Sequence, residues 1–417
     1  MGKEMKREDV IAEVKNKDVE FIRLQFTDLL GNLKNMAITS SQLEKALDNK
    51  FMFDGYSIRG FSAIEKSDMV LHPDYSTFEI FPWRPQHGKV ARMLCDVHTV
   101  DGQPFMGDSR FVLKTAIAKA AEAGYTLKVE PECEFFLFHT DENGQPTTVT
   151  HEQAGYLDIG PMDLGENARR DIVLTLEEMG FDVITSHHES APAQHEVDFA
   201  MCEALKAADN IMTFKLVVRT IAKRHGLHAT FMPKPRADVS GSGMHLKMAL
   251  YRDGKNVFRD DADPSGISET GRFFVGGILK HLKGMAALTN PIVNSYKRLC
   301  DPFALLHVPH GREEECCIEL RSPDSAANPY LALAALLTAG MEGIEEKILP
   351  PKAGRIETDR LPGSLEEAVT LMERDQLIKG ILGRECAATY LAAKKAEAEE
   401  YNRQVTAWEI SEYLNRV

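Results

Sequence analysis

One apolar segment that carries two carboxylates constrains the fold more than any other stretch of this chain. The segment VEPECEFFLF (residues 129–138) is rich in aromatic and apolar residues, so we expect it to be a β-strand. Because side chains alternate between the faces of a strand, Glu132 and Glu134 share one face. The same alternation places Phe136 and Phe138 on that face. Two carboxylates beside aromatic rings lose hydration and repel each other, so they need cations or raised pKa values. The alternative is an edge strand whose glutamates lie in solvent.

Two further segments carry polar side chains that could join these glutamates. SHHESAPAQHEVD (residues 186–198) places Glu189 and Glu196 in a predicted loop that leads into a helix. VSGSGMHLKMAL (residues 239–250) predicts a glycine-rich turn that opens a strand bearing His245. Histidine with carboxylates at such spacing suits zinc, whereas a set dominated by carboxylate oxygens suits a hard divalent cation. Taken alone, the first segment is more often a polar loop than a site, and a single strand histidine is more often structural than a ligand.

The remaining chain predicts two parts with a boundary near residue 103. Residues 1–102 combine one early helix with short strand-like pieces, which is typical of a small α+β module. These pieces lie at residues 19–28, 31–39, 79–85 and 89–102. From residue 103 onward, long helices with apolar faces alternate with strands. We expect helices at 108–124, 166–180, 199–226, 269–288 and 329–348, and acidic amphipathic helices from residue 364 to the end.

Composition narrows the class of protein. A length of 417 residues with 43% hydrophobic and 27% charged residues is typical of a globular protein with a substantial core. The net charge of −14 argues against a nucleic-acid or anionic-membrane partner. No apolar run approaches eighteen residues, and no apolar signal-peptide core opens the sequence. Seven scattered cysteines indicate a reduced chain, so we expect a cytoplasmic protein.

Seven motifs together identify a family resemblance over almost all of the chain. The chain resembles glutamine synthetase of the bacterial type I family, in its shorter form. In chain order, the motifs are FDGYSIRGF, PECEFFLF, SHHESAPAQHE, TFMPKP, SGSGMH, NPIVNSYKRL and IELRSPDSAANPYLALA. The resemblance implies an α+β fold with an N-terminal β-grasp-like domain (residues 1–102). It also implies a glutamine synthetase/guanido kinase-like α/β catalytic domain with an antiparallel sheet (residues 103–417).

The family reaction uses ATP to phosphorylate the γ-carboxylate of glutamate, and ammonia then displaces the phosphate. Such chemistry needs divalent metals and fixed cations around the transferring phosphoryl group. The resemblance implies two sites for Mg²⁺ or Mn²⁺ and small-molecule substrates that include ATP. It also implies a homo-oligomer, a dodecamer of two stacked hexameric rings, whose active sites lie between neighbouring subunits.

Site residues follow from the resemblance by motif position. One metal site is assigned to Glu134, Glu189 and Glu196, and the second to Glu132, His245 and Glu319. Two arginines match substrate-side catalytic arginines, Arg298 and Arg321. Gly241 matches the glutamate-binding turn, and Asp54 matches the catalytic aspartate that a neighbouring subunit contributes near the ammonium site.

The segment CDPFALLHVPHGREEECCIELRS (residues 300–322) departs from the family pattern. In the family, NSYKRL precedes a stretch resembling VPGYEAP, whose flap glutamate helps to deprotonate ammonium; that stretch is missing here. Pro302 and His307 stand where the family has the arginines of NRS and IRIP. Cys317 stands at the arginine position two residues before Glu319. The resemblance therefore implies a phosphate clamp that has lost three arginines.

Zinc binding is an alternative interpretation of the same segment. It holds four zinc-type ligands, namely His307, His310, Cys316 and Cys317. Adjacent cysteines rarely chelate one tetrahedral ion, and the usual spacer of two to four residues between them is absent. Because the family pattern accounts for both ends of the segment without a metal, we favour the altered clamp.

Two functions remain open from the sequence. The first is an ATP-dependent carboxylate–amine ligase that is slow with ammonia or acts on another amine or acid; the complete set of metal ligands favours it. The second is a non-catalytic assembly or regulatory protein, which the missing flap and arginines favour. Four further departures from the family pattern lie outside the altered segment, at Tyr56, Arg59, Ile184 and Ser240. These scattered changes argue against damage confined to residues 300–318.

Overall fold

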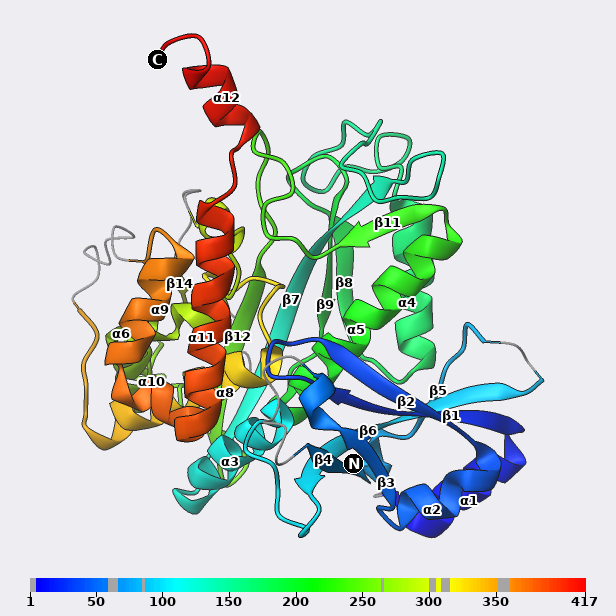
Figure 1. The fold of residues 1–417 in the computed structure, drawn as a ribbon. Helices are drawn as coiled ribbons and strands as arrows, with labels where there is room; N and C mark the ends of the chain where they lie inside the picture. The colour runs from blue at the N-terminus through cyan, green and yellow to red at the C-terminus, as the bar shows by residue number, and fades with distance from the viewer. Residues whose placement is uncertain are drawn as a thin grey trace.

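The computed structural model describes residues 5–58, 67–84, 87–263, 266–299, 305–308, 316–351 and 361–417. Figure 1 shows a small N-terminal module, drawn in blue, packed against a larger part that holds a second sheet and most of the helices. The last helix, α12 (Ala407–Tyr413), stands apart from both in all three ribbon views.

The N-terminal module is a mixed sheet with helices packed on it. Its strands are β1 (Val19–Thr27), β2 (Leu33–Thr39), β3 (Phe51–Asp54), β4 (Asp68–Pro73), β5 (Glu79–Ile80) and β6 (Lys89–Thr99). The order is β2-β1-β6-β4-β3, with β5 beside β6; β1 and β6 run parallel, whereas the other pairs are antiparallel. The helices are α1 (Arg7–Asn16) and α2 (Leu43–Leu47). Val10 of α1 joins Ile22 and Met93 of the sheet in one apolar core.

The larger part is built on an antiparallel sheet with the order β14-β15-β12-β7-β9-β8. Its strands are β7 (Thr126–His139), β8 (Val183–His188), β9 (Gln194–Phe199), β12 (Met244–Arg252), β14 (Leu306–His307) and β15 (Ile318–Leu320). Three short strands extend it: β10 (Cys202–Glu203) and β11 (Leu227–Thr230) pair with β7, and β13 (Lys255–Asn256) pairs with β12. Strand β7 is therefore central, and the edge-strand alternative for residues 129–138 is wrong.

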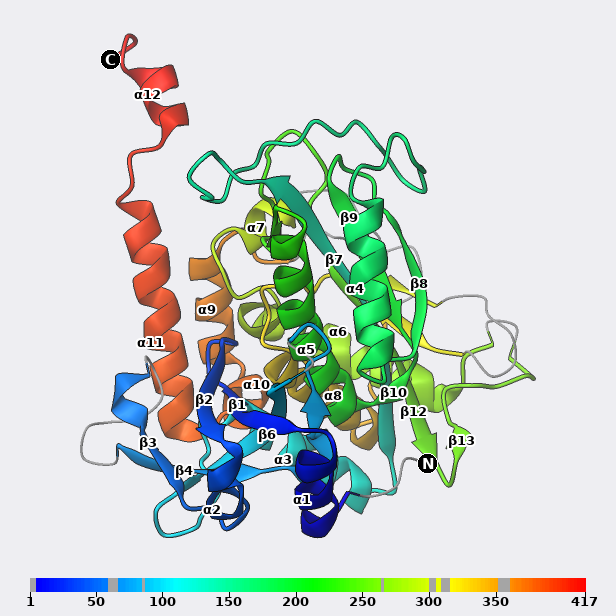
Figure 2. The same ribbon diagram turned by 90° about the vertical axis from the view of Figure 1, so that its right-hand side faces the viewer.

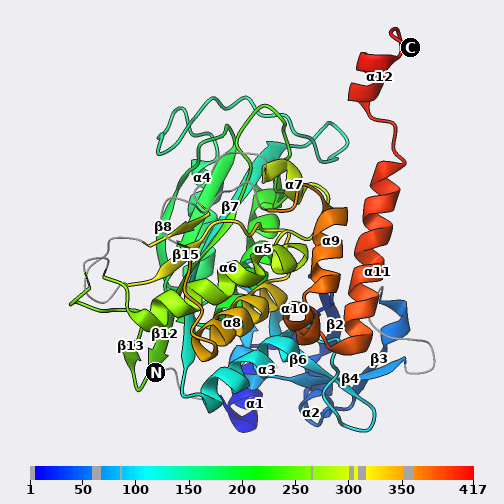
Figure 3. The same cartoon turned by 90° about the vertical axis from the view of Figure 1, so that its left-hand side faces the viewer.

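Helices cover one face of this sheet and leave the other face for polar side chains. The helices are α3 (Ser109–Glu122), α4 (Glu166–Glu178), α5 (Ala204–Arg224), α6 (Glu269–Thr289), α7 (Ser295–Arg298), α8 (Pro329–Glu345), α9 (Leu365–Arg374), α10 (Gln376–Ile381) and α11 (Gly383–Asn402). Figures 2 and 3 show them from opposite sides. Phe135 of β7 packs on Phe214 of α5, with ring centroids 5.7 Å apart. The odd-numbered side chains of β7 thus enter the core, and the even-numbered ones point away from it.

Most predicted elements are confirmed, with two shifts. The helix expected at 199–226 begins at Ala204, because Cys202 and Glu203 pair with β7 instead. The piece expected at 79–85 is a strand only at Glu79–Ile80. The helices expected near residues 108, 166, 269 and 329 all form, and the last residues form four helices as expected.

A buried guanidinium joins the two parts of the chain. Arg110, at the start of α3, is 3% exposed and donates to three carboxylates. Its Nη2 lies 2.7 Å from Asp74, and its Nη1 lies 2.8 Å from Asp96, both in the N-terminal module. Its Nε lies 3.0 Å from Asp209 of α5. One cation therefore neutralises acids from both parts and fixes how the parts meet.

Candidate active site

Strand register brings the predicted metal ligands onto one face of the central sheet. His245 of β12 lies opposite Glu132 of β7, and Glu196 of β9 lies opposite Glu134 of β7. Glu319 of β15, the next strand after β12, lies opposite Lys247, two residues along β12 from His245. The shared face predicted for Glu132 and Glu134 is therefore confirmed, and it is the face that the helices leave open.

We name the two groups by position. The central site comprises Glu132, His245 and Glu319, and the hairpin site comprises Glu134, Glu189 and Glu196. In the central site, Nδ1 of His245 lies 3.3 Å from Oε2 of Glu132 and 3.6 Å from Oε1 of Glu319. One oxygen or nitrogen from each of these three side chains lies within 4.8 Å of the others. This spacing leaves room for one shared cation.

The hairpin site lies beside the central site and is linked to it. Nε2 of His245 lies 3.7 Å from Oε1 of Glu134. At the far side, His187 contacts both remaining carboxylates, with Nδ1 3.7 Å from Glu189 and Nε2 3.3 Å from Glu196. The six predicted ligands thus lie on neighbouring strands and one turn. Those of the central site approach one another closely, whereas around Glu196 the close group comprises His187, Glu196 and Asp198.

The prediction that Glu196 lies in a loop leading into a helix is wrong. Residues 183–199 form a hairpin, and only the turn after His188 is irregular. Every residue from Gln194 to Phe199 is buried, so pairing with β7 determines the conformation of this polar sequence. Glu189 lies in the turn, as expected.

An excess of negative charge dominates the electrostatics of the hairpin site, and His187, whose pKa the hydrogen bond to Glu196 raises to about 9, offsets part of it. Burial is the main cause that raises the pKa of Glu196 well above its ordinary value, and the charges of Asp198 and Glu134 add to it. Burial and the charge of Glu134 also raise the pKa of Glu189. Carboxylates in such a state hold a proton unless a cation replaces it. An oxygen-rich, electron-donating set of this kind fits a divalent cation such as Mg²⁺ or Mn²⁺.

The central site differs because two permanently charged side chains, Lys247 and Arg321, already contact its carboxylates. Burial raises the pKa of Glu132, but hydrogen bonds from His245 and Lys247 outweigh this effect and bring it down to about 2. Lys247 Nζ lies 2.5 Å from Glu132, and Arg321 donates to both oxygens of Glu319 at 2.6 and 2.9 Å. A cation at this site therefore competes with Lys247 and Arg321 for the same carboxylates.

Comparison with known protein families gives two matches that together span nearly the whole chain. The model of the glutamine synthetase beta-Grasp domain matches residues 18–100, and that of the glutamine synthetase catalytic domain matches residues 106–413. The chain belongs to the glutamine synthetase family. The predicted resemblance and the predicted fold class are therefore confirmed, and the family is one of ATP-dependent ligases.

Similar proteins cover the chain from end to end. A glutamine synthetase from Clostridium saccharobutylicum is 54% identical over 98% of this chain and 99% of its own. One from Methanosarcina mazei is 48% identical, covering 98% of each chain. A solved structure of GmaS with ADP superposes with a TM-score of 0.89 at 32% identity, over 97% of this chain and 99% of its own. The glutamine synthetase of Plasmodium falciparum, at 24% identity over 98% of each chain, shares the fold with a TM-score of 0.87.

The two arginines and the glycine turn lie beside the glutamate clusters. Arg298 of α7 is 6% exposed, and its guanidinium donates to the carbonyls of Arg321 and Ser322 at 3.0 Å. A Cβ on Gly241 would lie 2.4 Å from the carbonyl oxygen of Pro233 and 3.0 Å from Cγ of Arg298. The close backbone approach therefore requires glycine, and Arg298 supports the turn and the strand end that bears Arg321.

Asp54 is not brought to the clusters within this chain. It ends β3, at the edge of the N-terminal sheet, where its side chain accepts from Tyr56 N at 3.0 Å and from Ser57 Oγ at 2.5 Å. Among the other departures from the family pattern, Ile184 and Ser240 are exposed. Arg59 lies outside the described residues.

The altered segment is described only in part. Pro302 and His310 lie outside the described residues, whereas His307 is exposed on β14 opposite Glu319. Cys317 is 5% exposed, and burial raises the pKa of its thiol to about 12, so it carries no charge at neutral pH. Within the described ranges, neither Cys316 nor Cys317 belongs to a group of three possible metal ligands.

The sequence interpretation missed residues that hold the clusters in place. His187 contacts two carboxylates, Lys247 neutralises Glu132, and Gln194 donates to Glu134 Oε2 at 2.6 Å. Alternation along the strand beginning at Met244 predicts Lys247 on the face of His245, and this is confirmed; its contact with Glu132 is the part that the sequence does not predict. Nothing comparable marks Gln194, because it reaches Glu134 only through strand pairing.

Proposed function

We propose that this chain is a two-metal ligase that activates the γ-carboxylate of glutamate with ATP and transfers it to ammonia or another amine. The observation that carries the proposal is the shared face on which the hairpin site and the central site meet at Glu134 and His245. The raised pKa values of Glu189 and Glu196 favour the binding of a cation in the hairpin site. The use of ATP is supported by the similar protein GmaS, whose structure was solved with ADP.

Each site has its own proposed role. Mg²⁺ or Mn²⁺ at the two sites would supply positive charge for crowded phosphate oxygens. Around them, Arg321 places a guanidinium at the open edge of the central site, and Arg298 and Gly241 shape the turn proposed to bind glutamate. Glu319 and Arg321 hold each other in a bidentate pair, so a bound phosphate would draw Arg321 from one anion to another.

We infer further that ammonia-dependent glutamine synthesis is slower here than in the relatives. The alignment with the C. saccharobutylicum enzyme spans 437 residues, so that relative has at least 20 (437 − 417) without a counterpart in this chain. Pro302, His307 and Cys317 supply no permanent charge for a phosphoryl group. One lost donor typically lowers the rate by about 10² to 10³. The relatives carry the plain name glutamine synthetase, which lends this inference no support, so the rate must be measured.

The proposed assembly is a dodecamer in the cytoplasm. Two observations support subunits that complete one another. Asp54, proposed to act near the ammonium site, is remote from the clusters of its own chain. In addition, α12 buries none of its residues, and Trp408 is 63% exposed. Such an apolar helix is typical of a contact with another subunit.

The proposed domain boundary stays at residue 102/103. No helix within the described ranges combines the length and apolar character needed to cross a bilayer.

A phosphate-release assay with glutamate, ATP and Mg²⁺ tests the proposal. Release that requires an amine, and that disappears in Glu196→Gln, would support the ligase. Turnover with ammonium equal to that of the C. saccharobutylicum enzyme, run in parallel, would refute the slower rate but not the ligase. No amine-dependent release from any of a panel of amines and acids, by protein that still binds nucleotide and assembles, would favour the non-catalytic alternative.

A further inference from the structure

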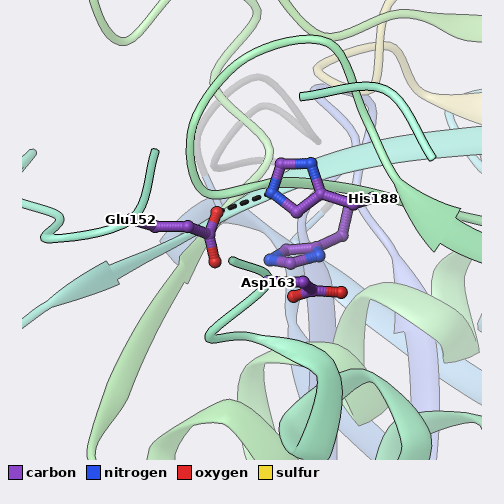
Figure 4. Close-up of side chains that lie close together, drawn as sticks. Glu152, Asp163 and His188 are labelled. Atoms are coloured by element: carbon purple, nitrogen blue, oxygen red, sulfur yellow. Dashed lines mark hydrogen bonds and ion pairs between the residues drawn. The ribbon is translucent and has the colours of Figure 1, made fainter. Parts of the chain in front are cut away.

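A cluster of buried titratable side chains lies under the turn of the β8–β9 hairpin. Its members are Glu152, Asp163, His188 and His195. Figure 4 shows the carboxylate of Glu152 bonded to the ring of His188, with Asp163 below them in this view. Four buried side chains of these types resemble a metal site in composition.

Hydrogen bonds argue against a metal ion in this cluster. Nη1 of Arg169 lies 2.8 Å from Nδ1 of His195, and a guanidinium only donates, so the ring proton of His195 is on Nε2. The same Arg169 nitrogen lies 2.7 Å from Asp163 and neutralises it. His188 has oxygen acceptors at both ring nitrogens. Neither imidazole therefore offers a lone pair to a metal.

Glu152 is instead a hub for hydrogen bonds. Its Oε1 accepts from His188 Nε2 at 2.6 Å and from the backbone N–H of Ala193 at 2.5 Å. Its Oε2 accepts from the N–H groups of Leu164 and Gly165 at 2.8 and 3.2 Å. One carboxylate thus ties the end of β8, the hairpin turn and the start of α4 together.

His188 carries this connection to the backbone of a proposed metal ligand. Its Nδ1 lies 2.6 Å from the carbonyl oxygen of Glu189 and 2.9 Å from that of Gly155. Its ring is 0% exposed, so these bonds have no competition from solvent. Glu152 and His188 therefore hold the turn of residues 189–193 by hydrogen bonds at both of its ends, Glu189 and Ala193; we call it the gripped turn.

The gripped turn in turn positions the remaining ligands of the hairpin site. Gln194 follows Ala193 directly, and its Oε1 accepts from the N–H of Ala191 at 3.0 Å, which closes the turn. Its Nε2 donates to Glu134 Oε2 at 2.6 Å. Glu196 lies two residues further on the same strand. Every ligand of the hairpin site is thus attached to the gripped turn.

The central site has no direct attachment of this kind, although it approaches the hairpin site where His245 faces Glu134. Its carboxylates are held by Lys247 and Arg321, which come from β12 and the end of β15. Within the described part of the chain, no hydrogen bond joins residues 152–165 to that site. A perturbation at Glu152 should therefore distinguish the two sites.

We propose that Glu152 and His188 are positioning residues that preform the hairpin site and leave the central site unaffected. The proposal rests on the metal sites of the proposed function. Groups that orient metal ligands typically change metal affinity about 10- to 100-fold when replaced. We therefore expect a loss of that size at one site of two.

Titration with Mn²⁺, followed by electron paramagnetic resonance, tests the proposal. Glu152→Gln keeps the shape but removes the charge, and His188→Asn keeps a donor in place of Nδ1 while losing the bond to Glu152. Both should weaken one class of Mn²⁺ site at least about tenfold and leave the other within about twofold. The weakened class should be the one that Glu196→Gln abolishes.

His281→Asn is the matched control. His281 of α6 is also buried between two carboxylates, at 2.7 Å from Asp375 and 2.5 Å from Glu342, but it lies among helices. It should lower the Tm without changing either Mn²⁺ affinity. Unchanged affinities in folded Glu152→Gln, or equal losses at both sites, would overturn the positioning role. A parent protein that binds no Mn²⁺ would instead refute the proposed metal sites.

Discussion

Replacing Glu134 with glutamine tests the metal assignment at the residue that links the two sites. Glu134 approaches His245 and accepts a hydrogen bond from Gln194. Its charge contributes to the raised pKa values of Glu189 and Glu196. Glutamine keeps the shape and removes the charge, so repulsion inside the hairpin site falls. We expect the metal-free variant to be at least as stable as the metal-free parent.

In the presence of Mg²⁺ we expect the opposite, because the variant loses the stabilisation that metal binding gives the parent. At a free Mg²⁺ concentration of about 100 times Kd, binding at one site stabilises the folded state by about 2.7 kcal/mol. For a catalytic part that spans residues 103–417, with about 2.1 cal/mol/K of unfolding entropy per residue, that free energy corresponds to a rise in Tm of roughly 4 °C. Glu134→Gln removes one of three carboxylates from the hairpin site, so the Mg²⁺-induced rise should shrink by about this amount.

The assay is a thermal melt at pH 7.5, with chelator or with increasing Mg²⁺. Glu130→Gln is the control, because Glu130 lies on the same strand face and pairs with Lys247 without belonging to either site. The control should keep the full Mg²⁺ response. A Mg²⁺-induced rise of equal size in Glu134→Gln and the parent would show that this carboxylate binds no metal.

Four other outcomes are expected. Arg110→Met should cost about 3–5 kcal/mol of stability by denaturant titration, because it removes the guanidinium that donates to both oxygens of buried Asp209; a loss below about 1 kcal/mol would contradict this role. Bonds to Asp375 and Glu342 outweigh burial and raise the pKa of His281, so its stabilisation is complete below about pH 6.5 and is lost as pH rises through the raised value. The Tm gap between parent and His281→Asn should narrow accordingly, and a widening gap would refute it. Trp408→Ser should weaken assembly in light scattering, and unchanged mass at low concentration would count against α12 as a contact. Mixed subunits of Asp54→Asn and Glu134→Gln should recover activity that neither has alone; no recovery after subunit exchange would exclude a shared site.

Strand periodicity explains what the sequence predicted well. Glu132 and Glu134 share a face because alternation is a local property of one strand, and His245 follows the same rule on β12. The sequence predicts a loop at Glu196 because the residues around it are polar and include Pro192. Its strand forms through pairing with β7, which no local pattern reports.

The supporting residues were harder to predict for a geometric reason. Glu152 and His188 are 36 residues apart, and the segment between them includes a helix, so only the folded chain shows their contact. Gln194 carries a neutral side chain, which has no pattern typical of a site. Lys247 was within reach, because its position two residues after His245 gives it the same face.

Arg110 has a consequence that extends beyond its own chain. The orientation of the N-terminal sheet relative to the catalytic sheet depends in part on one buried cation shared by Asp74, Asp96 and Asp209. In a ring where Asp54 acts in the active site of the next subunit, the angle between the two sheets of one chain determines how far Asp54 lies from the metal sites of its neighbour. A subunit altered at Arg110 would then impair the intact neighbour beside it. In a cell that made both versions, the defect would be dominant.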